Sequence, residues 1–287
     1  MTGGMIGRVC VVTGGSSGIG RATALGLAGM GATLALVCRD RARGEETVAE
    51  VTARTANRAV ALHLADLSSQ AAIRRLAAEL LARYPAIHVL INNAGVVNLR
   101  YSTTADGIET VFAVNHLAYF LLTSLLLDRL RRSAPARIVN VASEAHKFGR
   151  LDFADLGNQR RYRGMRVYGQ SKLANILFTY ELARRLEGSG VTANSVHPGA
   201  VGTRLGQNNG RMATLLTKVL RPFFRTPEQG AATSLHVASS PALEGISGKY
   251  FLSCREARSS RVSYDRDVAR RLWDVSARMT GCPEPAS

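Results

Sequence analysis

The sequence predicts one α/β domain of the doubly wound type, with about seven parallel strands flanked by helices. Short apolar runs rich in β-branched residues alternate with amphipathic segments of helical length, as expected for a buried parallel sheet with crossover helices. A glycine-rich turn joins the first apolar run to the first helical segment, which is the arrangement of a phosphate-binding unit. No repeat or linker divides the chain, so we expect a single domain over residues 1–287.

The composition is that of a soluble globular protein with an unusual excess of arginine. Hydrophobic residues make up 46% and charged residues 20% of the chain, whereas the formal net charge is +16. The 37 basic residues are 33 arginines and 4 lysines, scattered along the sequence and not gathered in a recognisable nucleic-acid-binding module. We therefore expect no nucleic acid as partner, and at most weak attraction to anionic surfaces or substrates.

The cysteines and the N-terminus favour a cytoplasmic protein. Four cysteines without a Cys-x-x-Cys pair are typical of reduced thiols, and residues 1–7 lack the pattern of an export signal. The uncharged segment 110–127 contains Asn115 and His116, so we expect a buried or interface helix there and no membrane span. No metal site is expected.

The first strand, turn and helix predict a cofactor phosphate site. Residues 8–13 form a strand pattern, and 21–30 read as a helix. Glycines between them let the backbone approach a pyrophosphate, which the helix N–H groups attract; a tight turn without a ligand is the alternative. The candidate residues are Gly14, Ser16, Ser17, Gly18, Ile19 and Gly20.

The end of the second strand, 33–38, bears on the choice of cofactor. A carboxylate at this position binds the ribose hydroxyl of NAD, whereas an arginine accommodates the 2′-phosphate of NADP. Arg39 follows the strand directly, and Asp40 lies one position later, where it can equally cap the next helix. The sequence therefore favours NADP(H) over NAD(H).

The third and fourth strands, 59–65 and 87–92, end in further candidate cofactor residues. A helix is expected over 41–56 and another over 69–84. At the end of the third strand, an acidic residue can accept a hydrogen bond from adenine; the alternative is that it caps a helix together with Ser68. At the end of the fourth strand, small or amide residues suit a cofactor crevice at the switch point of a parallel sheet; the alternative is a plain turn. These candidates are Asp66, Leu67, Asn93, Ala94 and Gly95.

The second half of the chain carries the candidate catalytic groups. A long helix, 107–132, contains Asn115, and the strand 136–142 ends at Ser143. The helix 167–186 begins with Tyr168 and Lys172, which lie one turn apart on the same face. A phenol titrates near pH ~10, and a nearby ammonium favours its ionised form, so the pair suits proton transfer at neutral pH. The remaining expected strands are 191–197 and 249–252.

Two long connections follow strand ends where ligands bind in such sheets. The connection 144–166 is rich in basic residues. The connection 200–226 mixes apolar and basic residues, and we expect it to form a substrate lid over a hydrophobic substrate, although local packing would explain its apolar residues almost as well.

Together these motifs resemble the short-chain dehydrogenase/reductase family along nearly the whole chain. The resemblance is closest to the retinol-dehydrogenase-like branch, through segments such as 38–40, 114–116, 170–178, 181–186 and 271–275. The hydrophobic N-terminal anchor of many animal members does not occur here, and the interval from Ser143 to Tyr168 has the length typical of this branch. The family motifs are Thr13 to Gly20, Asn92 to Gly95, Asn115, Ser143, Tyr168 with Lys172, and Pro198 with Gly199.

The resemblance implies a Rossmann-type fold and hydride transfer between nicotinamide and a carbonyl or alcohol carbon. Tyr168 would donate the proton, Lys172 would hold the nicotinamide ribose, Ser143 would bind the carbonyl, and Asn115 would hold a relay water. The branch suggests a small hydrophobic carbonyl or alcohol as substrate: a retinal-like compound, or a lipophilic or polycyclic ketone. The segment after the sixth strand would add cofactor contacts from Pro198, Gly199, Val201 and Thr203.

The resemblance also implies a homodimer or homotetramer, because the helices 110–127 and 168–186 commonly pair between subunits in this family. A non-redox isomerase or cyclase, or a regulatory NADP-binding module, is the alternative function on the same fold. The complete set of Asn115, Ser143, Tyr168 and Lys172 argues against it, because a pure binding module does not need all four.

Overall fold

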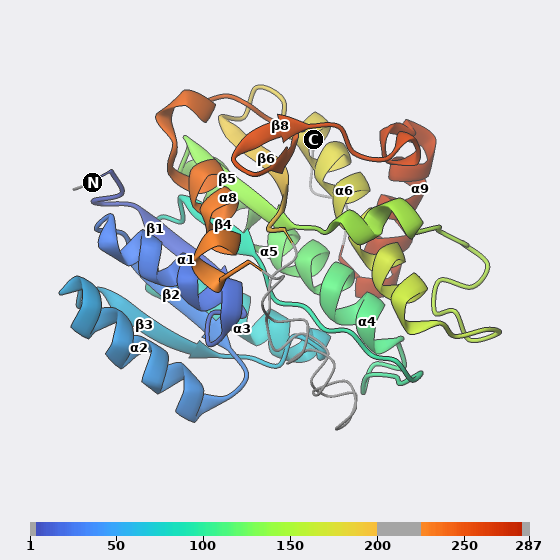
Figure 1. Cartoon of the computed structure of the whole chain (residues 1–287), viewed down its shortest axis with the longest axis horizontal. Helices are drawn as coiled ribbons and strands as arrows, with labels where there is room; N and C mark the ends of the chain where they lie inside the picture. Colours follow the sequence, from blue (N-terminus) through green and yellow to red (C-terminus); the bar gives the residue numbers. More distant parts are fainter. Residues whose placement is uncertain (1–3, 200–224, 283–287) are drawn as a thin grey trace.

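A computed structural model of the chain describes residues 4–199 and 225–282, and it contains one sheet in the order β3-β2-β1-β4-β5-β6-β7-β8 (Figure 1). The pairs from β3 through to β7 are parallel, and β8 pairs antiparallel with β7. The predicted doubly wound α/β fold is thus confirmed. The strands are β1 (Val9–Thr13), β2 (Thr33–Cys38), β3 (Val60–Leu64), β4 (Val89–Asn92), β5 (Ala136–Val141), β6 (Val191–His197), β7 (Tyr250–Leu252) and β8 (Arg255–Ala257).

The direction of winding reverses between β1 and β4. From β1 the chain builds outward to β2 and β3, then returns to the other side of β1 and builds outward again from β4. At such a switch point the connections leave to opposite sides, which opens a crevice beyond the carboxyl ends of the two central strands. Those ends carry Thr13 and Asn92, so the site is expected beside them.

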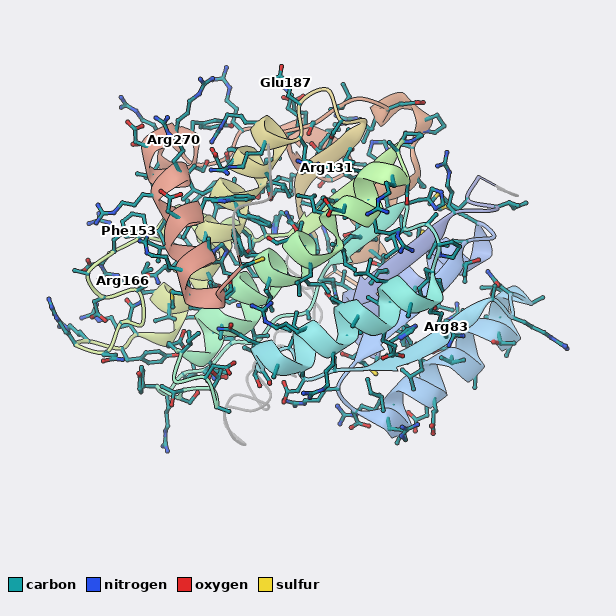
Figure 2. All side chains as sticks on the ribbon, turned by 180° about the vertical axis from the view of Figure 1, so that it is seen from behind. Arg83, Arg131, Phe153, Arg166, Glu187 and Arg270 are labelled. Atoms are coloured by element: carbon teal, nitrogen blue, oxygen red, sulfur yellow. The ribbon has the colours of Figure 1, made fainter. Side chains whose placement is uncertain are left out.

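Helices cover both faces of the sheet, with a hydrophobic core on each side (Figures 1 and 2). Apolar side chains from the two sides of each strand enter opposite cores because successive residues of a strand point to opposite faces. One face carries α1 (Gly18–Gly29), α2 (Arg41–Thr55) and α8 (Pro227–Ser239), and the other carries α3 (Gln70–Arg83), α5 (Ala118–Arg132), α6 (Gly164–Arg185) and α9 (Arg266–Thr280).

The edge strand β8 has no counterpart in the sequence-based prediction. It is three residues long and follows β7 through a two-residue turn in which Ser253 and Cys254 both have positive φ, 50° and 60°. Two-residue turns of this kind usually have the sequence Asn-Gly or Asp-Gly, whereas this one is Ser253-Cys254, so the sequence did not predict it. All four cysteines are free thiols.

The long helix predicted over 107–132 begins later and contains a π-turn. Glu109 starts it by accepting the backbone N–H groups of Val111, at 2.9 Å, and Phe112, at 2.7 Å. After α4 (Thr110–Phe112) comes the π-helical turn η1 (Ala113–Leu117), and the helix then continues as α5. Single π-turns within helices are frequent at functional sites, and this one carries Asn115.

This helix is buried, as predicted. Thr110–Arg132 is long and apolar enough to cross a membrane by length and composition alone, but 83% of its most apolar window is buried inside the fold. A core helix of a soluble protein has the same properties. The wider expectation of a chain without a membrane span stays a prediction.

The helix α9 covers α5 and α6 on the outer side of the sheet (Figure 2). Its Trp273 stacks on Phe178 of α6, with ring centroids 5.7 Å apart, and meets Phe120 of α5 edge-on at 5.0 Å. Further along α9, Ser276 lies 2.9 Å from Nε2 of His116. Pairing of α5 and α6 between subunits would therefore require α9 to move, and the expected homodimer or homotetramer stays a prediction.

Candidate active site

The glycine turn between β1 and α1 is shaped by close backbone contacts. Gly14 has φ +67°, and a Cβ on it would lie 2.9 Å from Cα of Ala94. A Cβ on Gly20 would lie 2.2 Å from the carbonyl oxygen of Gly14, so both positions need glycine. Ser17 stands at the N-cap of α1 without a side-chain hydrogen bond to the helix. The Ser17 side chain therefore does not cap the N–H groups in the first turn of α1, which fits the binding of a dinucleotide pyrophosphate there.

The end of β4 is tied to the end of β1 by hydrogen bonds. Oγ1 of Thr13 accepts the backbone N–H groups of Asn93, at 2.9 Å, and Ala94, at 3.2 Å. The side-chain amide of Asn93 donates a hydrogen bond to the carbonyl oxygen of Thr13 at 2.9 Å. The Tyr119 hydroxyl donates a hydrogen bond to the carbonyl oxygen of Ala94 at 2.8 Å. Asn93 and Ala94 therefore lie beside the glycine turn, as predicted for the crevice.

Thr13 and Tyr119 are supporting residues that the sequence did not single out as site residues. A threonine ending a strand and a tyrosine in an apolar helix are ordinary, so neither carries a local signal. The available clue for Thr13 was its place immediately before the glycine turn.

The side chain of Asn115 fastens the π-turn to two other elements. Its Oδ1 accepts the N–H of Val96 at 2.7 Å, and its Nδ2 donates to the carbonyl of Val96 and to Oγ of Ser171, each at 3.0 Å. Ser171 in turn donates to the carbonyl of Tyr168 at 2.7 Å. Asn115 thus joins the loop after β4 to the first turns of α6, which is a structural role.

Ser143, Tyr168 and Lys172 converge where α6 passes the end of β5. Lys172 donates from Nζ to the carbonyl of Val141, the last residue of β5, at 3.0 Å. The same Nζ lies 5.6 Å from the ring centroid of Tyr168, and the Ser143 side chain is near enough to the Tyr168 hydroxyl to lower its pKa. Ser143 begins the 3-10 helix η2 (Glu144–Phe148), where its Oγ accepts the N–H of Ala145 at 3.2 Å. The four candidate catalytic residues therefore form one cluster.

Burial dominates the electrostatics of this cluster. It raises the pKa of Tyr168 to about 12, an effect that the neighbouring Ser143 side chain only partly offsets. It lowers the pKa of Lys172 to about 7, because the ammonium loses its hydration. The pKa of Tyr168 is therefore raised and not lowered toward neutral pH, because burial of the phenolate is the largest effect on it.

The residues at the ends of β2 and β3 have different surroundings. Arg39 is exposed, whereas Asp40 caps α2 by accepting the N–H of Arg43 at 3.1 Å. Asp66 accepts the N–H of Ser68 at 3.0 Å and its hydroxyl at 2.8 Å, so both carboxylates make the local contacts that were the structural alternatives. Leu67 is buried in the core.

The last predicted cofactor segment is only partly described. Pro198 and Gly199 follow β6, and Gly199 has φ +85°, a value that favours glycine. Val201 and Thr203, and the expected lid 200–226 except for Arg225 and Thr226, lie outside the described residues.

Comparison with known proteins shows the family to which the chain belongs. A family model for short chain dehydrogenases matches residues 8–214. The chain therefore belongs to the short-chain dehydrogenase/reductase family, whose fold binds a nicotinamide cofactor and supports oxidoreductase chemistry.

Similar curated proteins define the branch of the family. Retinol dehydrogenase 12 of Mus musculus is 48% identical over 275 residues, covering 96% of this chain and 87% of that protein. Retinol dehydrogenase 11 of Homo sapiens is 49% identical over 277 residues, with the same coverage of both chains. The chain thus lies in the retinol-dehydrogenase-like branch, as its motifs predicted.

Solved structures show the same fold. A Mycobacterium paratuberculosis protein described as uncharacterized has a TM-score of 0.79 and 33% identity, covering 98% of this chain and 96% of that one. The Pseudomonas aeruginosa RhlG/NADP active-site complex has a TM-score of 0.69 and 30% identity, covering 86% of this chain and 94% of that one.

Proposed function

We propose that the protein is an NADP(H)-dependent oxidoreductase that interconverts a carbonyl and an alcohol on a small hydrophobic substrate. The observation that carries the proposal is the cluster of Ser143, Tyr168 and Lys172 at the end of β5, braced through Ser171 by Asn115. A dinucleotide-binding module without chemistry would not require a buried tyrosine near a serine and a buried lysine.

The first-turn donors of α1 and the amine of Lys172 fit a bound dinucleotide. Lys172 has three N–H donors, and the carbonyl of Val141 is its one hydrogen-bond acceptor among the described residues. The remaining donors suit the hydroxyls of a nicotinamide ribose. The nicotinamide supplies or accepts the hydride when it is bound.

The residues of this chain would then manage the proton and the developing charge. In reduction Tyr168 donates its phenolic proton to the substrate oxygen as that oxygen becomes an alkoxide. The Ser143 hydroxyl hydrogen-bonds the same oxygen and fixes its distance from Tyr168. Asn115 would hold a relay water, although its side-chain donors are already engaged by Val96 and Ser171, so its positioning role has the stronger support.

A hydrophobic substrate suits the surroundings of Tyr168. Val97, Val111 and Val167 are buried against it, and Val96, Ala145 and Tyr162 pack partly exposed around the same cluster. The similar proteins are named retinol dehydrogenases, which makes retinoids the first compounds to test. Lipophilic aldehydes and polycyclic ketones present the same combination of one carbonyl and an apolar body.

The test of the proposed function is NADPH oxidation, followed by absorbance, with retinal, lipophilic aldehydes, ketones and polycyclic quinones. We expect turnover with at least one hydrophobic carbonyl. Tight NADPH binding without oxidation by any of them would contradict the proposal and favour a binding module or a non-redox enzyme.

The preference for NADP(H) rests on the exposed Arg39 and the engaged Asp40. Because Asp40 is held as a helix cap by Arg43, it is poorly placed to bind a ribose hydroxyl, whereas Arg39 is free to meet a 2′-phosphate. Two of the similar structures are NADP complexes, which supports the same preference.

Arg39→Ala is expected to weaken NADPH binding roughly 10- to 100-fold while leaving NADH binding nearly unchanged, because a hydrogen-bonded charge pair contributes about 1.5–3 kcal/mol. Both dissociation constants can be measured by fluorescence titration. Arg41→Ala, which removes a neighbouring exposed arginine paired with Glu45, is the matched control. Equal losses for the two cofactors would refute the assignment of Arg39.

The raised pKa of Tyr168 predicts opposite pH dependences for the two directions. With a pKa of about 12 the phenol stays protonated through neutral pH, so the proton needed for reduction is present. Oxidation needs the phenolate, and its fraction grows with pH up to that value. We expect kcat/KM for alcohol oxidation to rise from pH 6 to pH 10 while that for reduction does not. A pH-independent oxidation rate would contradict this assignment.

A further inference from the structure

His146 is a buried histidine of η2 with two backbone partners. Its Nδ1 lies 2.7 Å from the carbonyl oxygen of Ser143, and its Nε2 lies 3.0 Å from the backbone nitrogen of Ser260. The side of its ring packs on Tyr250 of β7, with centroids 5.3 Å apart. The imidazole therefore bridges the residue that begins η2 and a segment more than a hundred residues later in the chain.

These two partners determine the protonation of the ring. A carbonyl oxygen only accepts, so Nδ1 must carry the proton; a backbone N–H only donates, so Nε2 must be bare. Both contacts are satisfied together only by the neutral tautomer with the proton on Nδ1. Burial lowers the pKa of His146 and favours the same neutral form.

The segment that contacts His146 also holds α6. Oγ of Ser259 lies 2.8 Å from the Tyr180 hydroxyl, and Tyr180 stacks on Tyr264 at 5.3 Å. Tyr180 is three turns along α6 from Tyr168. Residues 259–264 therefore contact the element that carries Ser143 on one side and the helix that carries Tyr168 on the other.

The two site elements also meet directly, with little room for adjustment. A Cβ on Gly169 would lie 2.6 Å from the carbonyl oxygen of Ala145, and one on Gly149 would lie 2.4 Å from that of Gly169. Because η2 and α6 are packed backbone to backbone here, a rotation of η2 at its Ser143 end changes the distance between Ser143 and Tyr168.

We propose that His146 is a positioning residue, which fixes the backbone of Ser143 relative to Tyr168 by donating from Nδ1 to the Ser143 carbonyl while Ser260 enforces the required tautomer. The inference rests on the proposed oxidoreductase function and adds to it a residue that touches neither cofactor nor substrate. It assigns the segment 259–264 a part in the geometry of the site.

The groups facing His146 do not replace this contact. On η2 itself, Glu144 pairs with Lys147 and accepts a hydrogen bond from the Tyr250 hydroxyl. From the end of β6, His197 faces the same group of residues, and burial keeps its pKa at about 4. None of these side chains makes a hydrogen bond with the Ser143 carbonyl in the described part of the chain.

The test compares His146→Leu with His146→Asn. Leucine removes the donor to the Ser143 carbonyl. The side-chain amide nitrogen of asparagine occupies nearly the position of Nδ1, and it donates to that carbonyl whatever the contact with Ser260. We expect His146→Leu to lower kcat by roughly 10- to 100-fold, since small misplacements of a reacting group have effects of this size. NADPH affinity should stay unchanged. With 4-deuterated NADPH, the isotope effect on kcat should rise in His146→Leu and return toward the wild-type value in His146→Asn.

The control is His63→Leu, which removes another buried histidine bonded on both nitrogens, to Glu79 and Tyr84, far from the site. It should lose stability without a change in kcat or isotope effect. Equal kcat and isotope effects for wild type and His146→Leu would overturn the proposal.

A readout independent of turnover separates this inference from the proposed function. Amide hydrogen exchange of residues 143–148 should accelerate in His146→Leu and stay slow in His146→Asn. If no carbonyl is reduced by the wild type, the proposed function fails while exchange still tests the positioning contact. Unchanged exchange in His146→Leu would overturn the positioning role in that case too.

Discussion

Tyr168→Phe is expected to lower kcat for carbonyl reduction by roughly 10²–10⁴-fold, the range that a general acid contributes. The phenyl ring keeps the packing against Val97 and Val167, so the fold and the crevice should be preserved. What is lost is the phenolic hydroxyl that serves as proton donor beside Ser143. Steady-state kinetics with saturating NADPH measure the effect, and NADPH binding should remain close to wild type.

Tyr84→Phe is the matched control for this substitution. It removes another buried phenolic hydroxyl, one that lies 3.0 Å from Nε2 of His63 at the far edge of the sheet. It should alter stability slightly and kcat not at all. If Tyr168→Phe retained wild-type kcat, another group would have to supply the proton, and the proposed role of Tyr168 would be rejected.

Lys172→Met is expected to abolish most activity and, at neutral pH, to stabilise the cofactor-free protein. Removing one preorganised donor from an active site typically reduces kcat by about 10²–10³-fold, and loss of the ribose contact should also weaken NADPH binding. Methionine fills a similar volume without a charge. The carbonyl of Val141 keeps a donor after the change, because Nδ2 of Asn175 lies 3.3 Å from it.

The stabilisation follows from the pKa of Lys172, which falls from 10.5 for an ordinary lysine to about 7 on burial. Between these two pH values the unfolded chain binds a proton that the folded chain does not, so wild-type stability rises with pH through this window. The destabilisation of the folded wild type by the buried Lys172 is absent above pH 10.5, grows as pH falls and is fully present below about 7. Each pKa unit corresponds to about 1.4 kcal/mol.

Denaturant unfolding at several pH values measures this difference. Lys172→Met should exceed wild type in free energy of unfolding by a few kcal/mol at pH 7, and the gap should narrow toward pH 10. Lys249→Met, at an exposed lysine paired with Glu256, should show no such pH-dependent gap. A gap that is constant with pH would mean that Lys172 titrates normally.

The features of the site that the sequence predicts are those fixed by spacing along one element. Tyr168 and Lys172 share a helix face because four residues make about one turn, and the glycines after β1 are required wherever strand and helix meet so closely. Strand ends also predict well, because the carboxyl ends of parallel strands meet at one edge. Asn93, Ser143 and Pro198 were predicted in this way.

Features that depend on contacts between distant segments did not emerge from the sequence. The π-turn at Asn115 has no compositional mark, and the partners of Asn115 lie 19 and 56 residues away. The direction of the pKa shift of Tyr168 depends on how deeply Tyr168 and Lys172 are buried. The spacing of two residues along a helix does not give this burial. The role of His146 depends on Ser260, which is 114 residues distant.

The helix α9 is synthesised after the two helices, α5 and α6, that it covers. Translation proceeds from the N-terminus, so α5 and α6 leave the ribosome before the segment that covers their outer face. Until Trp273 reaches Phe120 and Phe178, the apolar side of the helix that carries Tyr168 and Lys172 stays open to solvent and to chaperones. A nascent chain stalled before α9 would thus possess the catalytic cluster without the cover on the helix that bears it.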